Sequence, residues 1–128
     1  KGDALYNAGH PNESLDCYKA ALALAPKDAE CWHDYGLTLL ELGIVDEAGE
    51  AFTRVIEIMP EWYIGYYSLA KVMVLLEKTN LAAKLLIEVF SRNPQMQTEF
   101  HLEFAKFMTL KQLRILLERI VKLKDEKI

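Results

Sequence analysis

The chain has only two cysteines, Cys17 and Cys31, among its 128 residues. Two thiols this far apart are too few for a zinc site or a redox pair, so we expect semi-buried thiols in a reducing compartment. Nothing in the sequence argues for a disulfide between them. No apolar run approaches the roughly 20 residues that a membrane-spanning helix needs, which predicts no membrane span in this segment.

Catalytic and metal-binding motifs are also missing. His10, His33 and His101 are scattered, and none belongs to an H-E-x-x-H or C-x-x-C arrangement. There is no G-x-S-x-G elbow and no glycine-rich phosphate loop. We therefore expect no enzymatic activity, no metal and no cofactor. The basic residues near the C-terminus lack the glycine and aromatic interleaving of a nucleic-acid platform, so a nucleic-acid partner is not expected.

What the chain does contain is a period of thirty-four residues, which Pro26, Pro60 and Pro94 mark most clearly. A period between about 20 and 50 residues is the mark of a stacked repeat array. The same interval separates Gly2 and Gly36; Gly9 and Gly43; Leu5, Leu39 and Met73; Ser14, Ala48 and Ala82; Tyr18, Phe52 and Leu86; and Trp32, Tyr66 and Phe100.

Each period holds two segments in which apolar residues recur at helical spacing. Gly43 interrupts the pattern between two such segments, which predicts a helical hairpin with a short turn. Each proline ends a second helix, because the residue before a proline is pushed out of the α region. Asp28 is the predicted N-cap of the following helix. The predicted helices cover 1–8, 12–25, 29–42, 46–58, 63–77, 80–92, 96–108 and 110–126, without strands.

The best copy of the unit, Ala29 to Trp62, resembles the tetratricopeptide repeat, whose pattern is W-x2-L-G-x2-Y, then A-x3-F, then P. The match is carried by Trp32, Tyr35, Gly36, Leu39, Gly43, Ala48, Phe52 and Pro60, with Tyr35 and Leu39 replacing the usual Leu and Tyr. The resemblance implies an all-α, right-handed superhelical α-solenoid of about three helix hairpins plus a divergent C-terminal helix pair. The chain would be a single array with units at 1–28 (partial), 29–62, 63–96 and 97–128.

The segment from Gln97 to Ile128 departs from the repeat. Phe100, Phe104 and Phe107 form a helical stripe, but Glu103 stands where a large apolar residue is expected. No proline ends the second helix, and Thr109 with Gln112 forms a plausible capping pair at its start. A divergent capping helix pair is the usual end of such an array. The alternative is a docking surface for another copy of the chain.

In tetratricopeptide repeat proteins, the first helix of each unit lines a concave surface that usually holds a partner peptide. The resemblance assigns this peptide-binding groove to Tyr6, His33, Asp34, Leu37, Leu40, Tyr67, Lys71 and Val74, and we add Trp62 from the aromatic run described next. An apolar strip edged by charges suits an amphipathic helix or an extended apolar peptide with some positive charge. The run Trp62, Tyr63, Tyr66 and Tyr67 adds candidate aromatic anchors, since only Tyr66 falls on a packing position. Alternatively, Trp62 and Tyr63 are ordinary filler between repeats.

One partner class is argued against. Tetratricopeptide repeat co-chaperones hold the acidic C-terminal tail of heat-shock proteins with a clamp of Lys, Asn and Arg. The matching positions here are Asp3, Asp34, Ile64 and Ser68. Because the basic donors are absent and two carboxylates stand in their way, we do not expect capture of the heat-shock-protein tail.

Charge is divided unevenly along the chain. Residues 1–64 hold 4 basic and 12 acidic side chains, a net of −8, whereas residues 65–128 hold 11 and 7, a net of +4. The asymmetry favours partners, or neighbouring copies, of opposite sign at each end.

Two functions are compatible with these features. The first is a protein–protein interaction module that binds a partner peptide or helix in an apolar concave groove. The second is a self-associating scaffold element that uses its last helix and its charge-divided ends as a homo-oligomer contact. Because the chain starts with Lys1 rather than Met, we expect a piece of a longer polypeptide. A cytoplasmic location is favoured.

Overall fold

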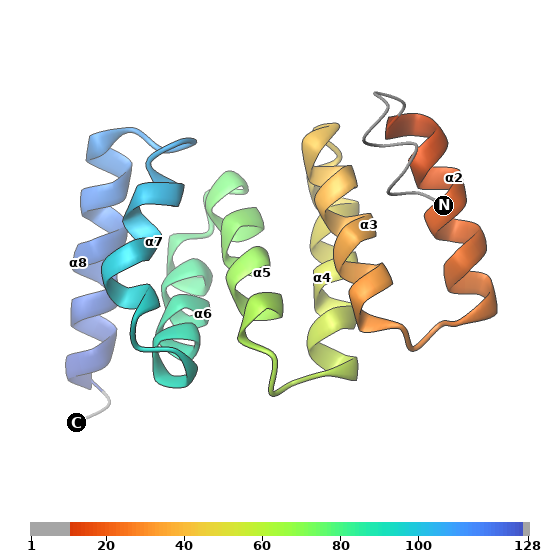
Figure 1. Cartoon of the computed structure of the whole chain (residues 1–128). Coiled ribbons are helices and arrows are strands. Elements are labelled where there is room, and N and C mark those ends of the chain that lie inside the picture. The colour runs from red at the N-terminus through yellow and green to blue at the C-terminus, as the bar shows by residue number, and fades with distance from the viewer. Residues whose placement is uncertain (1–10, 127–128) are drawn as a thin grey trace. The chain divides into compact units, whose positions relative to one another are not determined.

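The computed structural model describes residues 11–126, which form seven helices and contain no strand (Figure 1). The helices are α2 (Pro11–Leu24), α3 (Ala29–Glu41), α4 (Val45–Ile58), α5 (Tyr63–Leu75), α6 (Thr79–Arg92), α7 (Met96–Phe104) and α8 (Leu110–Glu126). The predicted all-α class and the predicted order of helices are confirmed over this range. The expected helix at 1–8, together with Tyr6, lies outside the described residues.

The chain divides into two compact units, residues 1–65 and 66–128. Gly65 is uncharged, so the net charges of residues 1–65 and 66–128 are the same −8 and +4 that the sequence halves carry. The division therefore separates an acidic unit from a basic one. The repeat boundaries expected at 28, 62 and 96 stay a prediction.

Two polar contacts fix the start of α3 in the first unit. The backbone N–H of Cys31 donates to Asp28 Oδ1 at 3.1 Å, which confirms Asp28 as the N-cap. The indole Nε1–H of Trp32 donates to the carbonyl oxygen of Pro26 at 2.9 Å. These contacts hold the turn after α2 against the first turn of α3. The centroids of the Trp32 and Tyr35 rings lie 6.0 Å apart on the same helix.

Gly36 is a point of close packing in the first unit, where α3 lies beside α4 (Figure 1). A Cβ atom built on Gly36 would lie 2.5 Å from Phe52 Cε1. Phe52 is fully buried and Leu39, Ala48 and Val55 complete the surrounding core. The small residue in the W-x2-L-G pattern therefore makes room for an aromatic ring of the partner helix.

In the second unit, α6 lies beside α8, and buried residues come from all of its helices. Phe100 and Phe104 of α7 are buried, as are Leu113, Leu116 and Ile120 of α8. Leu117, next to Leu116 on α8, is 40% exposed.

The predicted extent of α7 is wrong at its C-terminal end. The helix stops at Phe104 rather than at 108, and the backbone N–H groups of Lys106 and Phe107 donate to carbonyls three residues back, at 3.1 and 3.2 Å. Such bonds tighten the last turn of a helix. Thr109 and Gln112 then open α8 with a reciprocal pair of side-chain bonds at 2.9 and 3.1 Å, which confirms the predicted capping pair.

Two residues one period apart adopt the left-handed backbone conformation. Gly43 has a φ of 79° between α3 and α4, and Glu77 has a φ of 60° between α5 and α6. Glycine reaches this region without steric cost, whereas a side chain with a Cβ does not. The second turn therefore carries backbone strain that the first avoids.

Replacing Glu77 with glycine should raise the free energy of unfolding by about 1 kcal/mol, because glycine adopts the same left-handed backbone conformation without steric strain. The reciprocal change, Gly43→Glu, should lower it by about 1–2 kcal/mol, since no atom lies within 4 Å of a Cβ there and only the backbone term acts. Urea denaturation of the two variants measures both effects. Equal stability of all three proteins would show that the left-handed turns carry no such cost.

Candidate functional site

The expected groove residues of the first unit lie on one side of α3. His33, Asp34 and Leu40 are half-buried, and Leu37 is 40% exposed. The Thr38 hydroxyl donates to the Asp34 carbonyl oxygen at 3.0 Å, a contact within α3. Leu37 is therefore the most accessible apolar residue of this set within the first unit.

Carboxylates surround Leu37. Glu30, Asp34, Leu37 and Glu41 follow one another at spacings of four, three and four residues, so they share one face of α3. Glu30 and Glu41 are exposed. The surface formed by Glu30, Asp34, Leu37 and Glu41, called the α3 surface below, combines one apolar side chain with three negative charges.

Carboxylates also give α4 a negative charge in this unit. Burial raises the pKa of the Tyr35 hydroxyl, and the carboxylates of Glu47 and Glu50 raise it further. Each of these causes penalises the negative phenolate form. The first unit therefore offers an acidic environment on α4 as well as on the α3 surface.

The Trp62 ring packs against the candidate groove residue His33. The His33 ring lies 5.5 Å from the Trp62 ring and 5.5 Å from the Phe52 ring, measured between centroids. Trp62 is half-buried. His33 thus links a core aromatic to a partly accessible one, and Trp62 has a packing role whatever else it contacts.

The expectation that Tyr67 is an aromatic anchor outside the packing positions is wrong. Tyr67 is only 5% exposed, and its ring packs on Phe104 at a centroid distance of 5.5 Å. Tyr66, which was assigned the packing position, is half-buried beside the Arg92 guanidinium, 4.9 Å from its ring centroid. Phe104 comes from α7, far along the sequence, so local spacing could not reveal this contact.

Lys71 and Glu103 form an ion pair in the second unit. The Lys71 ammonium also lies 5.0 Å from the centroid of the Tyr67 ring, and the Tyr67 hydroxyl reaches Glu103 Oε1 at 3.5 Å. Burial lowers the pKa of Lys71, and the positive charge of Lys106 lowers it further. The pairing explains why a carboxylate is tolerated where the repeat pattern calls for an apolar residue.

Val74, the last expected groove residue, is half-buried and lines a hollow of about 220 Å³ in the second unit. The other lining residues are Glu77, Thr79, Met108, Gln112, Ile115 and Leu116. No sequence pattern predicts this hollow, because it forms where the end of α5, the start of α6 and the start of α8 meet.

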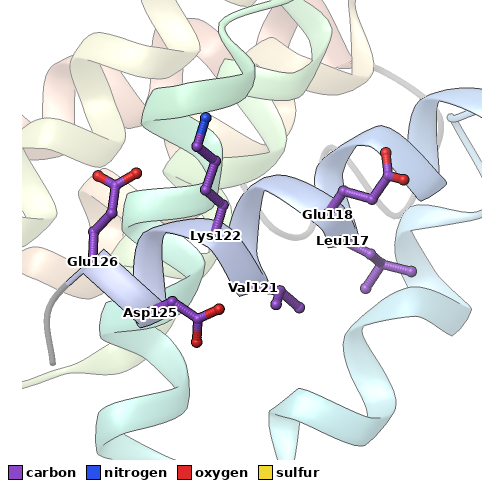
Figure 2. Close-up of a pocket in the computed structure, with 6 residues that line it drawn as sticks. All are labelled: Leu117, Glu118, Val121, Lys122, Asp125 and Glu126. Atoms are coloured by element: carbon purple, nitrogen blue, oxygen red, sulfur yellow. The ribbon is translucent and has the colours of Figure 1, made fainter.

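A second, more open depression follows α8 (Figure 2). Val121 and Asp125 point to one side of the helix and Lys122 and Glu126 to the other, as Figure 2 shows. Leu117 and Glu118 complete the lining. Leu117 and Val121, four residues apart, are 40% and 59% exposed.

Two negative findings concern only residues 11–126. Over that range no helix is both long enough and apolar enough to cross a membrane. Within the same range, no group of three or more His, Cys, Asp and Glu side chains is arranged to hold a metal ion. Cys17 and Cys31 are both half-buried thiols.

A family model of the tetratricopeptide repeat matches residues 1–61 of the sequence. Residues 1–61 of the chain therefore carry the tetratricopeptide repeat. Two curated relatives are peroxisomal targeting signal receptors. The one from Eremothecium gossypii is 34% identical over 59 residues, and the one from Candida albicans is 31% identical over 58 residues. These matches cover 46% and 45% of the chain but only 10% of each receptor.

Solved structures share the tetratricopeptide repeat fold. MamA superimposes with a TM-score of 0.73 at 17% identity, covering 97% of this chain and 74% of MamA. YrrB gives 0.72 at 24% identity over 80% of this chain and 53% of its own. The repeat domain of Arabidopsis OM64 gives 0.71 at 20% identity over 95% and 89%. The chain is thus an all-α solenoid of the tetratricopeptide repeat type.

Family and fold together support a protein–protein interaction module. Tetratricopeptide repeat proteins are generally non-enzymatic, in line with the missing catalytic motifs of the sequence. Which residues of this tetratricopeptide repeat chain contact a partner is a separate question.

Proposed function

We propose that this tetratricopeptide repeat segment is a non-enzymatic module that binds a peptide or helix of a partner protein. The observation that carries the proposal is the α3 surface, where Leu37 is 40% exposed among three carboxylates. YrrB is described as a tetratricopeptide repeat protein with an unusual peptide-binding site, and the curated relatives are receptors for a targeting signal. Both descriptions support peptide binding as the general activity.

The chemistry of the α3 surface favours a cationic amphipathic partner. Leu37 offers apolar area that a partner side chain would cover, and the half-buried Leu40 lies one turn further along the helix. Asp34 and Glu41 flank Leu37 and would attract Lys or Arg side chains on either side of the apolar contact. A partner with alternating apolar and basic residues therefore fits better than an acidic tail.

In the second unit, Lys71 and Val74 remain candidate contacts. Lys71 already pairs with Glu103. A partner group would therefore have to bind the N–H donors of the Lys71 ammonium that Glu103 does not occupy. Tyr67 is excluded as an exposed anchor by its burial. The α3 surface is consequently the better-founded part of the proposed binding region.

Replacing Leu37 with glutamate should weaken partner binding at least about tenfold, because the apolar contact is lost and a fourth carboxylate is added. Stability should stay within about 0.5 kcal/mol, since the side chain is partly exposed on a helix. An array of short peptides that alternate apolar with basic or acidic residues, probed with the purified protein, measures the effect.

The matched control is Leu24→Glu, at a leucine of the same unit that is 89% exposed on α2. This variant should retain the peptides that the unmodified protein retains. The proposal fails if the two glutamate variants bind alike, or if acidic peptides are retained as well as basic ones. The self-association alternative stays a prediction, which the exposed Leu117 and Val121 of α8 support.

A further inference from the structure

The hollow lined by Val74, where α5 ends and α6 and α8 begin, is partly enclosed, whereas the other depressions are more open. Its apolar wall is formed by Val74, Met108, Ile115 and Leu116, from α5, α8 and the segment that joins α7 to α8. Leu116 is fully buried and forms the floor, whereas Ile115 is 42% exposed at the rim. The early end of α7 at Phe104 contributes to this geometry, because Met108 lies in the connecting segment rather than in a helix.

The volume of the hollow limits what it can hold. At about 220 Å³ it is smaller than the roughly 300–1,000 Å³ of pockets that bind whole small molecules. It is comparable with an apolar cavity of about 150 Å³ that accepts a benzene molecule. A single large apolar side chain, such as leucine or phenylalanine, is therefore the best-fitting occupant.

Glu77 adds a negative charge to the rim. The Glu77 side chain is exposed. None of the ion pairs found among residues 11–126 involves Glu77. Thr79 and Gln112 are the polar neighbours, and the Gln112 side chain already accepts the backbone N–H of Thr109. No basic residue lines the hollow itself, whereas Lys78 and Arg119 line the adjoining depression that shares Glu77 and Thr79. Within the hollow, a cation brought by a ligand is the complementary charge.

The backbone of Glu77 gives a second reason to assign this carboxylate a role. The equivalent turn one period earlier uses Gly43, which adopts the left-handed conformation without strain. Residues with a strained backbone are concentrated at functional sites. An observed backbone outlier therefore supports a hypothesis that its side chain has a function. Glycine would adopt this turn without strain, which makes the Glu77 carboxylate a candidate for a role in binding.

We propose that the hollow lined by Val74, Met108, Ile115 and Leu116 binds one large apolar side chain of a partner peptide, with an adjacent lysine or arginine paired to Glu77. Of these residues, only Val74 was assigned to the groove by the family resemblance. The site is distinct from the α3 surface and can be present or absent independently of it.

A nuclear magnetic resonance titration with three capped dipeptides tests the assignment. Acetyl-Leu-Arg-amide should shift the methyl signals of Val74, Met108 and Ile115 in a saturable manner. Acetyl-Ala-Arg-amide should bind at least about tenfold more weakly, since three buried carbons are lost. Acetyl-Leu-Glu-amide should bind at least about threefold more weakly, because the attraction to Glu77 becomes repulsion.

Two protein variants separate the apolar contact from the charge. Ile115→Asp should abolish the saturable shifts, whereas Leu117→Asp, at a leucine of similar exposure on the same helix, should leave them unchanged. Glu77→Gly should weaken acetyl-Leu-Arg-amide about threefold and remove the preference over acetyl-Leu-Glu-amide.

The assignment is overturned if the folded protein shows no saturable shift at these methyls, or if Ile115→Asp binds as the unmodified protein does. Equal binding of the Arg and Glu dipeptides would remove Glu77 from the site. Binding of the dipeptide by Leu37→Glu is expected to be normal, so failure of this site and failure of the α3 surface are distinguishable.

Discussion

Replacing Phe104 with alanine should lower the free energy of unfolding of the second unit by about 3–5 kcal/mol, the usual cost of removing a buried phenylalanine. Phe104 is fully buried, and its ring contacts those of Tyr67, Phe100 and Phe107 at centroid distances of 5.5, 5.6 and 5.1 Å. The substitution removes the ring on which all three others pack. Neither apolar area nor aromatic contacts can be recovered without a shift of α7.

Amide hydrogen exchange measures this effect unit by unit, which a single denaturation curve does not. Exchange should accelerate in α6, α7 and α8. The control is Leu102→Ala on the same helix, at a residue that is 68% exposed, where a change within about 0.5 kcal/mol is expected. A loss below about 1 kcal/mol for Phe104→Ala would mean that the aromatic cluster does not hold α7 in place.

Replacing Gly36 with alanine should destabilise the first unit by about 1–3 kcal/mol, although alanine is the better helix former. The new methyl group would lie 2.5 Å from Phe52 Cε1 and 2.9 Å from Cδ1 and Cζ. Phe52 is fully buried, so its ring has no free space into which to move. Urea denaturation gives the sign directly, since an absent clash would raise stability by roughly 1 kcal/mol.

The repeat itself supplies the compensating change. One period after Gly36 and Phe52, the second hairpin has Ala70 and Leu86, both fully buried. A larger residue on one helix is thus matched by a smaller one on its neighbour. The double variant Gly36→Ala, Phe52→Leu should be more stable than the sum of its single changes by more than about 0.5 kcal/mol. Strict additivity would refute steric coupling.

Local features of the fold were predictable because their causes are local. The helix starts follow from the Asp28 cap and from the Thr109–Gln112 pair, whose partners lie three residues apart. Gly36 followed from the repeat pattern, and the structure shows that the Phe52 ring occupies the space beside it.

Contacts between distant segments were not predictable in the same way. Tyr67 is buried by Phe104, and Glu103 is accommodated by Lys71, in each case across more than thirty residues that no periodicity connects. The early end of α7 has no proline or glycine to announce it. The hollow beside Val74 depends on that end, so the candidate site in the second unit appears only in three dimensions.

The division of the chain after Gly65 leaves both tryptophans, Trp32 and Trp62, in the first unit. Intrinsic indole fluorescence therefore reports the melting of residues 1–65 alone, while far-ultraviolet ellipticity sums the helices of both units. Coincident curves from the two probes would show a single cooperative transition, and separated curves would resolve two. The distribution of two chromophores thus turns ordinary spectroscopy into a measure of cooperativity along the array.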